Sequence, residues 1–137
     1  MSSTPPGTCA LSTVLRTSFD DAVAKTTAAL SEQGFGVLTT IDIKSTLKQK
    51  IDKDMEDYLI LGACNPSLAS RALDSDRRIG QLLPCNVVVR ANTSGGGILV
   101  EAMDPQLMVA VMDEAGLQPV ADEAAAKLRA AISTLAG

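Results

Sequence analysis

Cys64 and Cys85 are the residues best suited to chemistry in this chain of 137 residues. Each is followed by an asparagine, Asn65 or Asn86, and each stands where an apolar run of the sequence ends or begins. Thiolates act as nucleophiles, form reversible disulfides and bind soft metals. The chain has no histidine, which excludes Ser-His-Asp and Cys-His nucleophile systems, and two thiols complete only half of a tetrahedral zinc site.

The direction of two predicted strands decides whether these thiols meet. The segment YLILGAC (58–64) is apolar at both odd and even positions, which predicts a central strand covered on both faces. The segment CNVVVR (85–90) is predicted to form the next strand. Antiparallel neighbours would bring Cys64 to Cys85, whereas parallel neighbours would leave the two roughly 15–20 Å apart. The alternative to a functional site is that both are small buried apolar side chains.

Glu101 is a carboxylate within an apolar strand segment. CNVVVR and ILVEAM flank the loop NTSGGG, a pattern typical of a β-hairpin. If Arg90 pairs with Ile98, then Glu101 shares a face of the sheet with Cys85. A shift of one residue moves Glu101 to the opposite face, where it is an ordinary solvent-facing residue. Both registers stay open.

Asp42 and Lys44 lie at a predicted junction between a strand and a helix. Lys44 and Lys48 share a helix face and could bind an anionic ligand or a partner. A solvated face with Asp42 as the helix cap is the favoured interpretation. Asn65 is likewise predicted to cap a helix, and the start of that helix could hold an anion close to Cys64.

The elements that position these residues follow from periodicity and cap signals. Residues 1–8 predict a flexible arm and residues 9–137 a single domain. The pattern favours an α+β fold, with about five strands in a mostly antiparallel sheet and helices packed on one face. A doubly wound parallel sheet is the alternative. The predicted strands are 9–18, 35–43 (half-buried), 58–64, 85–90 and 98–103. The predicted helices are 19–33, 43–51, 78–83 and 121–135, together with one that begins at Pro66 and one that begins at Pro105. Gly116 and Pro119 are predicted to end the helix that begins at Pro105.

Charge and hydropathy limit the partners. The net charge is −4 and only 2% of residues are aromatic, which argues against nucleic acid because binders need a basic face and stacking platforms. The longest apolar run, 58–64, is far shorter than the ~20 residues that span a bilayer, so no membrane partner is expected. With no signal peptide and an odd number of cysteines, the predicted location is the cytoplasm.

Four segments carry a family resemblance: FGVLTTIDIKSTLK (35–48), LGACNPSLASRAL (61–73), GQLLPCNVVVR (80–90) and VEAMDP (100–105). They resemble the bacterial and archaeal domain-of-unknown-function family 302, over about residues 10–136. The resemblance implies a compact α+β domain that is often a homodimer. It implies no particular reaction.

Three functions remain for the chain. The first is a homodimeric binding module that holds a small ligand or soft metal near Cys64 and Cys85. The second is a thiol-based redox enzyme or sensor, with Cys64 reactive and Cys85 resolving. The third is a structural dimerisation domain that uses 107–112 or the alanine-rich tail. The sequence leans away from an enzyme and identifies no cofactor. The predicted ligand-binding residues are Cys64, Asn65, Cys85, Asn86, Glu101, Asp42 and Lys44.

Overall fold

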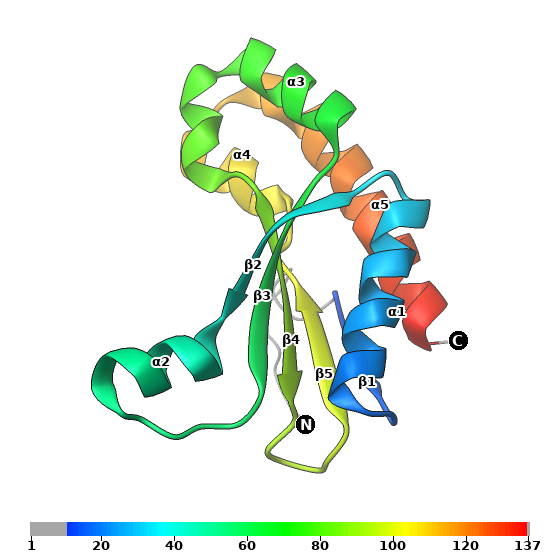
Figure 1. Cartoon of the computed structure of the whole chain (residues 1–137). Coiled ribbons are helices and arrows are strands. Elements are labelled where there is room, and N and C mark those ends of the chain that lie inside the picture. The colour runs from blue at the N-terminus through cyan, green and yellow to red at the C-terminus, as the bar shows by residue number, and fades with distance from the viewer. Residues whose placement is uncertain (1–10, 137) are drawn as a thin grey trace.

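A five-stranded sheet organises the computed structural model, which describes residues 11–136 (Figure 1). The strand order is β1-β5-β4-β3-β2, and every neighbouring pair is antiparallel. The predicted α+β class and antiparallel sheet are confirmed, and the parallel doubly wound alternative is wrong. The N-terminal segment predicted to be flexible (residues 1–8) and Cys9 lie outside the described residues. The strands are β1 (Ser12–Leu15), β2 (Gly36–Asp42), β3 (Tyr58–Cys64), β4 (Cys85–Ala91) and β5 (Ile98–Ala102).

The helices begin where cap residues predict. Ser18 Oγ accepts a hydrogen bond from the Asp21 N–H at 3.1 Å, and Asn65 caps the helix that Pro66 opens. Pro119, predicted to break a helix, instead lies in the first turn of one, where its missing N–H costs nothing. Among residues 11–136, no helix has the length and apolar character needed to cross a membrane. The helices are α1 (Phe19–Glu32), α2 (Ile43–Ile51), α3 (Pro66–Ser75), α4 (Gln106–Met112) and α5 (Gln118–Ala136), with 3-10 turns η1 (Arg77–Leu82) and η2 (Ala115–Leu117).

The core lies between one face of the sheet and the paired helices α1 and α5, with α3 and α4 at one end (Figure 1). Alternate residues of β3, β4 and β5, including Leu61, Val87 and Val100, are fully buried on this face. The opposite face, called the uncovered face below, is more exposed, and Tyr58 and Ile60 are only half-buried there. The expectation that β3 is covered on both faces is therefore wrong for its first half.

The β4–β5 hairpin adopts the second of the two registers that the sequence left open. Arg90 lies opposite Leu99 rather than Ile98, because the ladder continues to a further pair between Ala91 and Ile98. This register places Val100 and Ala102 in the core. It also places Glu101 on the uncovered face, where its Oε1 accepts a hydrogen bond from Arg90 Nε at 2.8 Å. Of the two alternatives for Glu101, the solvent-facing one holds, and Glu101 does not share a face with Cys85.

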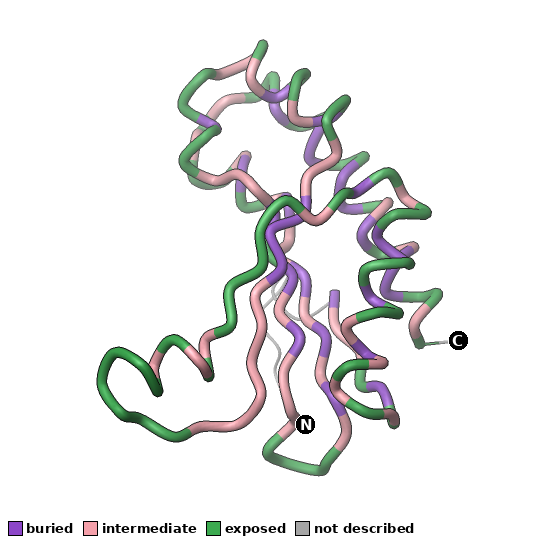
Figure 2. The backbone as a smooth tube through the Cα atoms, viewed as in Figure 1, coloured by how far each residue is buried: buried purple, intermediate pink, exposed green. Residues whose placement is uncertain are grey.

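Strand β2 and helix α2 form an arm (residues 36–57) that leaves the body of the molecule (Figure 1). A β-bulge between Val37 and Thr39 reverses the alternation, so that Val37 packs against the core while Ile41 falls on the uncovered face. Every residue of β2 except Val37 is exposed, so the prediction of a half-buried strand is wrong. Helix α2 has no buried residue either. Figure 2 shows no buried segment along α2 or its flanking loop.

We predict that Gly62→Ala lowers the free energy of unfolding by about 1–3 kcal/mol, because overpacking a rigid site costs this much. A Cβ at Gly62 would overlap Thr39 Oγ1 and lie 2.8 Å from Pro84 Cγ, and the proline ring cannot rotate away. Gly36→Ala is the matched control, since a Cβ there meets no atom within 4 Å. Urea denaturation measures both variants. Equal stability of the two variants would contradict this packing.

Candidate functional site

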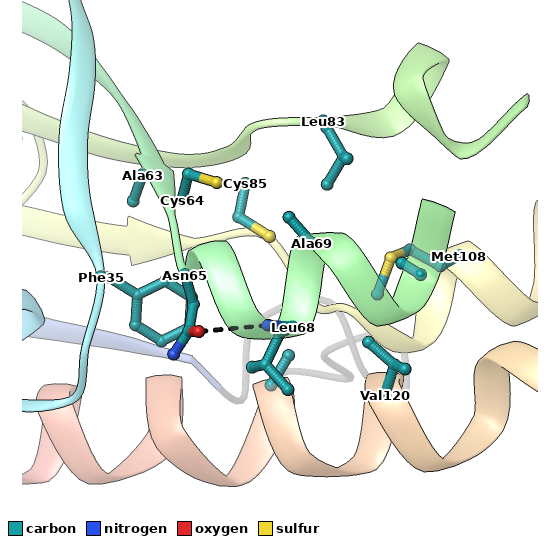
Figure 3. Close-up of a pocket in the computed structure, with 12 residues that line it drawn as sticks. Phe35, Ala63, Cys64, Asn65, Leu68, Ala69, Leu83, Cys85, Met108 and Val120 are labelled. Atoms are coloured by element: carbon teal, nitrogen blue, oxygen red, sulfur yellow. Dashed lines mark hydrogen bonds between the residues drawn. The ribbon is translucent and has the colours of Figure 1, made fainter. Parts of the chain in front are cut away.

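A pocket opens where the end of β3 and the start of β4 meet α3, α4 and α5 (Figure 3). Its cavity has a volume of about 20 Å³. The empty space is about 330 Å³ when the open solvent at the mouth is included. Almost all of its wall is apolar. The lining residues are Phe35, Ala63, Cys64, Asn65, Leu68, Ala69, Ala72, Leu83, Cys85, Met108, Val120 and Ala124.

Strand pairing brings the two thiols into this pocket. Strands β3 and β4 are antiparallel neighbours, with Ala63 opposite Cys85, so Cys64 lies one residue beyond the last pair. Both side chains line the pocket, and both thiols are free. The antiparallel arrangement, which the sequence left open, therefore holds, and Figure 3 shows the two sulfur atoms on the same side of the pocket.

Asn65 turns the chain from β3 into α3. Its Oδ1 accepts the Leu68 N–H at 3.2 Å, and its Nδ2 donates to the Gln33 carbonyl at 3.4 Å. The predicted cap is confirmed. These bonds tie the loop after α1 to the start of α3, so the first turn of α3 begins directly beside Cys64. The partial positive charge of that helix terminus favours negative charge at this place.

The pocket has a partly exposed entrance and a buried interior. Cys64, Ala69 and Leu83 are partly exposed and lie at the mouth. Cys85 and Met108 lie deeper, with exposed fractions of only 6% and 2%. Burial, with a smaller contribution from the neighbouring Cys64, raises the pKa of the Cys85 thiol to about 11. The interior therefore holds a neutral thiol at pH 7.

The other predicted site residues lie elsewhere. Asn86 is exposed on the uncovered face of the sheet, opposite Gly62, and Glu101 pairs with Arg90 on that same face. Neither reaches the pocket. The hairpin register and the alternation of β4 both place these side chains on the face away from Cys85.

Asp42 and Lys44 lie at the opposite end of β2 from the pocket, about 20 Å along a strand of seven residues. Asp42 Oδ1 accepts the Ser45 N–H at 2.9 Å and so caps α2, and Lys44 Nζ contacts Asp57 Oδ1 at 3.2 Å. The cap that the sequence favoured is confirmed. This pair is not brought together with the thiols.

Sequence reasoning missed the third sulfur atom of the pocket. Met108 belongs to an apolar stripe of α4 that predicts a core position, and it is indeed buried. Its periodicity carries no sign that it lines a pocket with two cysteines. Phe35 was likewise assigned to a strand, yet it closes the pocket next to Asn65 (Figure 3). Within residues 11–136, no group of three or more cysteine, aspartate or glutamate side chains could hold a metal ion.

Comparison with known proteins agrees with the fold. The family model for the domain of unknown function DUF302 matches residues 11–135. The chain belongs to this family. A similar solved structure is the crystal structure of an uncharacterized conserved DUF302 protein from Bacillus stearothermophilus, with a TM-score of 0.81 and 25% sequence identity, covering 89% of this chain and 94% of that chain. No curated protein matches significantly. DUF302 membership thus confirms the fold and names no reaction.

Because the pKa of Cys85 is raised, the stability of this DUF302 chain is expected to change with pH in the alkaline range. Between the ordinary thiol pKa of 9.0 and the folded-state value of about 11, the unfolded thiol loses its proton while the folded one keeps it. The free energy of unfolding therefore falls as pH rises. By pH 11 the loss specific to Cys85 reaches about 2 kcal/mol.

Cys85→Ala removes this contribution, so its stability should fall less than that of the wild type between pH 8 and pH 11. Denaturant unfolding at each pH measures the two slopes. The comparison cancels all other titrating groups because they are common to both proteins. Parallel pH profiles would show that Cys85 is not protected by burial.

Proposed function

We propose that the protein is a homodimeric binding module that holds a small ligand in the Cys64/Cys85 pocket. The observation that carries this proposal is the pocket itself, which places two thiols against an apolar wall beside a helix start. The cavity of about 20 Å³ is far smaller than the roughly 300–1,000 Å³ of sites for drug-sized ligands, so the ligand must be small. The enclosed part holds only a ligand of one or a few atoms.

The pocket supports binding better than thiol redox catalysis. A resolving cysteine must reach the thiolate form, and burial raises the pKa of Cys85 to about 11. A neutral, buried thiol suits a binding wall that ionises only when a ligand displaces its proton. Two free thiols also suit a reducing compartment, and the cytoplasm is such a compartment.

The arm supports the dimeric part of the proposal. Leu38, Ile41 and Ile51 are 68%, 47% and 65% exposed, although the sequence pattern around them is amphipathic. A helix of nine residues is marginal in water without tertiary packing, and α2 buries none of its side chains in this chain. The apolar side chains of β2 and α2 are therefore suited to cover by another molecule.

A second copy of the chain fits this surface. Strand β2 is a seven-residue sheet edge, and a two-fold axis would pair β2 with the β2 of a partner in the antiparallel direction that the rest of the sheet already uses. The charges of the arm do not oppose this pairing, because Lys44 forms an ion pair with Asp57 and Lys48 forms ion pairs with Asp52 and Asp54 within the chain.

We expect the wild-type protein to have twice the 14.2 kDa mass of one chain in light scattering coupled to size exclusion. Leu38→Glu places a charge on the proposed interface and should give a monomer. Val111→Glu is the matched control: Val111 is 60% exposed but lies on α4, away from the arm. A monomeric wild type, or a dimer unaffected by Leu38→Glu, would refute this interface.

Ligand binding is tested by native mass spectrometry of the protein purified from its own cells under reducing, metal-replete conditions. We expect a mass above that of the polypeptide. Ala69→Leu should remove the added mass, because Ala69 lines the mouth and a larger side chain fills it. Ser70→Leu, at the adjacent exposed position of α3, should leave the added mass in place. A bare polypeptide mass in the wild type would count against the binding module.

A further inference from the structure

Three sulfur atoms of different elements line the same pocket. Cys64 ends β3, Cys85 begins β4 and Met108 lies on α4 across the pocket from the thiols (Figure 3). Among residues 11–136, the rest of the wall is almost entirely carbon, and its one polar side chain, Asn65, is occupied by its bonds to Leu68 and Gln33. The pocket therefore offers soft sulfur donors and no carboxylate or imidazole.

We propose that this pocket binds one Cu(I) ion, with Cys64 and Cys85 as thiolate ligands. This assignment rests on the proposed binding module and names the class of its ligand. Thiolate and thioether sulfur favour Cu(I) over harder cations. Cu(I) accepts two sulfur ligands in a linear arrangement, so the two thiolates complete its coordination.

The size of the cavity suits a single ion. Its enclosed volume of about 20 Å³ is close to what one water molecule requires. Cys64 lies at the partly exposed mouth, whereas Cys85 and Met108 are buried in the interior. An ion entering from solvent therefore meets Cys64 first and then the deeper Cys85.

The binding step balances without a redox partner. Cu(I) displaces one proton from each thiol, two copper–sulfur bonds form, and both protons pass to solvent. The ion and the two thiolates then carry a net charge of −1. The start of α3 directly after Asn65 offsets this charge, because the helix dipole places partial positive charge there.

The same set of donors is poor for zinc. Structural zinc requires four ligands, most often cysteine and histidine. The pocket supplies two thiols, and the sequence contains no histidine. Apolar walls around the sulfur atoms also limit the access of water, and a dry site favours the cuprous ion over the more strongly hydrated cupric ion.

The test is an anaerobic titration of the reduced full-length protein with Cu(I), in competition with a chromophoric Cu(I) chelator. We expect one Cu(I) per chain. Cys64→Ser and Cys85→Ser should each weaken binding by about 100-fold or more. Cys9→Ser is the control for the third thiol of the sequence, and it should leave the affinity unchanged.

Thermal unfolding with and without Cu(I) provides a second readout, since a ligand bound only by the folded chain raises Tm. The rise should occur in the wild type and in Cys9→Ser, and it should vanish in Cys64→Ser, whose partly exposed position tolerates substitution even if Cys85→Ser fails to fold. Unchanged affinity in Cys64→Ser overturns the copper site. A wild type that takes up no Cu(I), yet carries another ligand in native mass spectrometry, also overturns it and leaves the binding module standing.

Discussion

The antiparallel pairing of β3 with β4 is the constraint on which both the core and the candidate site depend. It sets Leu61 beside Val87 at the centre of the buried face and Ala63 beside Cys85 at its end. Because α3 begins immediately after β3, the same ladder decides where that helix starts. A change in this register would move core side chains to the uncovered face and would at the same time move the two thiols apart.

Local signals in the sequence were enough to predict most elements and their starts. A cap such as Ser18, or the Asn65–Pro66 pair, depends only on neighbouring backbone groups, so it can be recognised without the fold. Hairpin register is different. The loop between Ala91 and Ile98 contains three consecutive glycines with positive φ, and such a loop can close the hairpin at more than one pair. The side of the sheet that Glu101 occupies was therefore not decided by the sequence.

The candidate site also combines residues that local sequence signals could place with residues that only tertiary packing brings in. Cys64, Asn65 and Cys85 stand at the ends of consecutive elements, so the sequence could place them near one another once the strands were taken as antiparallel. The contributions of Met108 and Phe35 arise only when α4 and the start of β2 pack against α3 and α5. A buried methionine in a helical stripe has the same pattern whether it fills a core or faces a cavity.

The unpaired edge at β2 also limits how the chain can assemble. From Gly36 to Ile41 this edge carries no charged residue, and proteins commonly use charge or proline to stop strands from adding to an open edge. In the proposed dimer the two β2 edges pair with each other. Each end of the joined sheet is then β1, a strand of only four residues. Growth then stops at two chains. A chain prevented from pairing would keep a long open sheet edge, and such an edge favours the addition of further strands and aggregation.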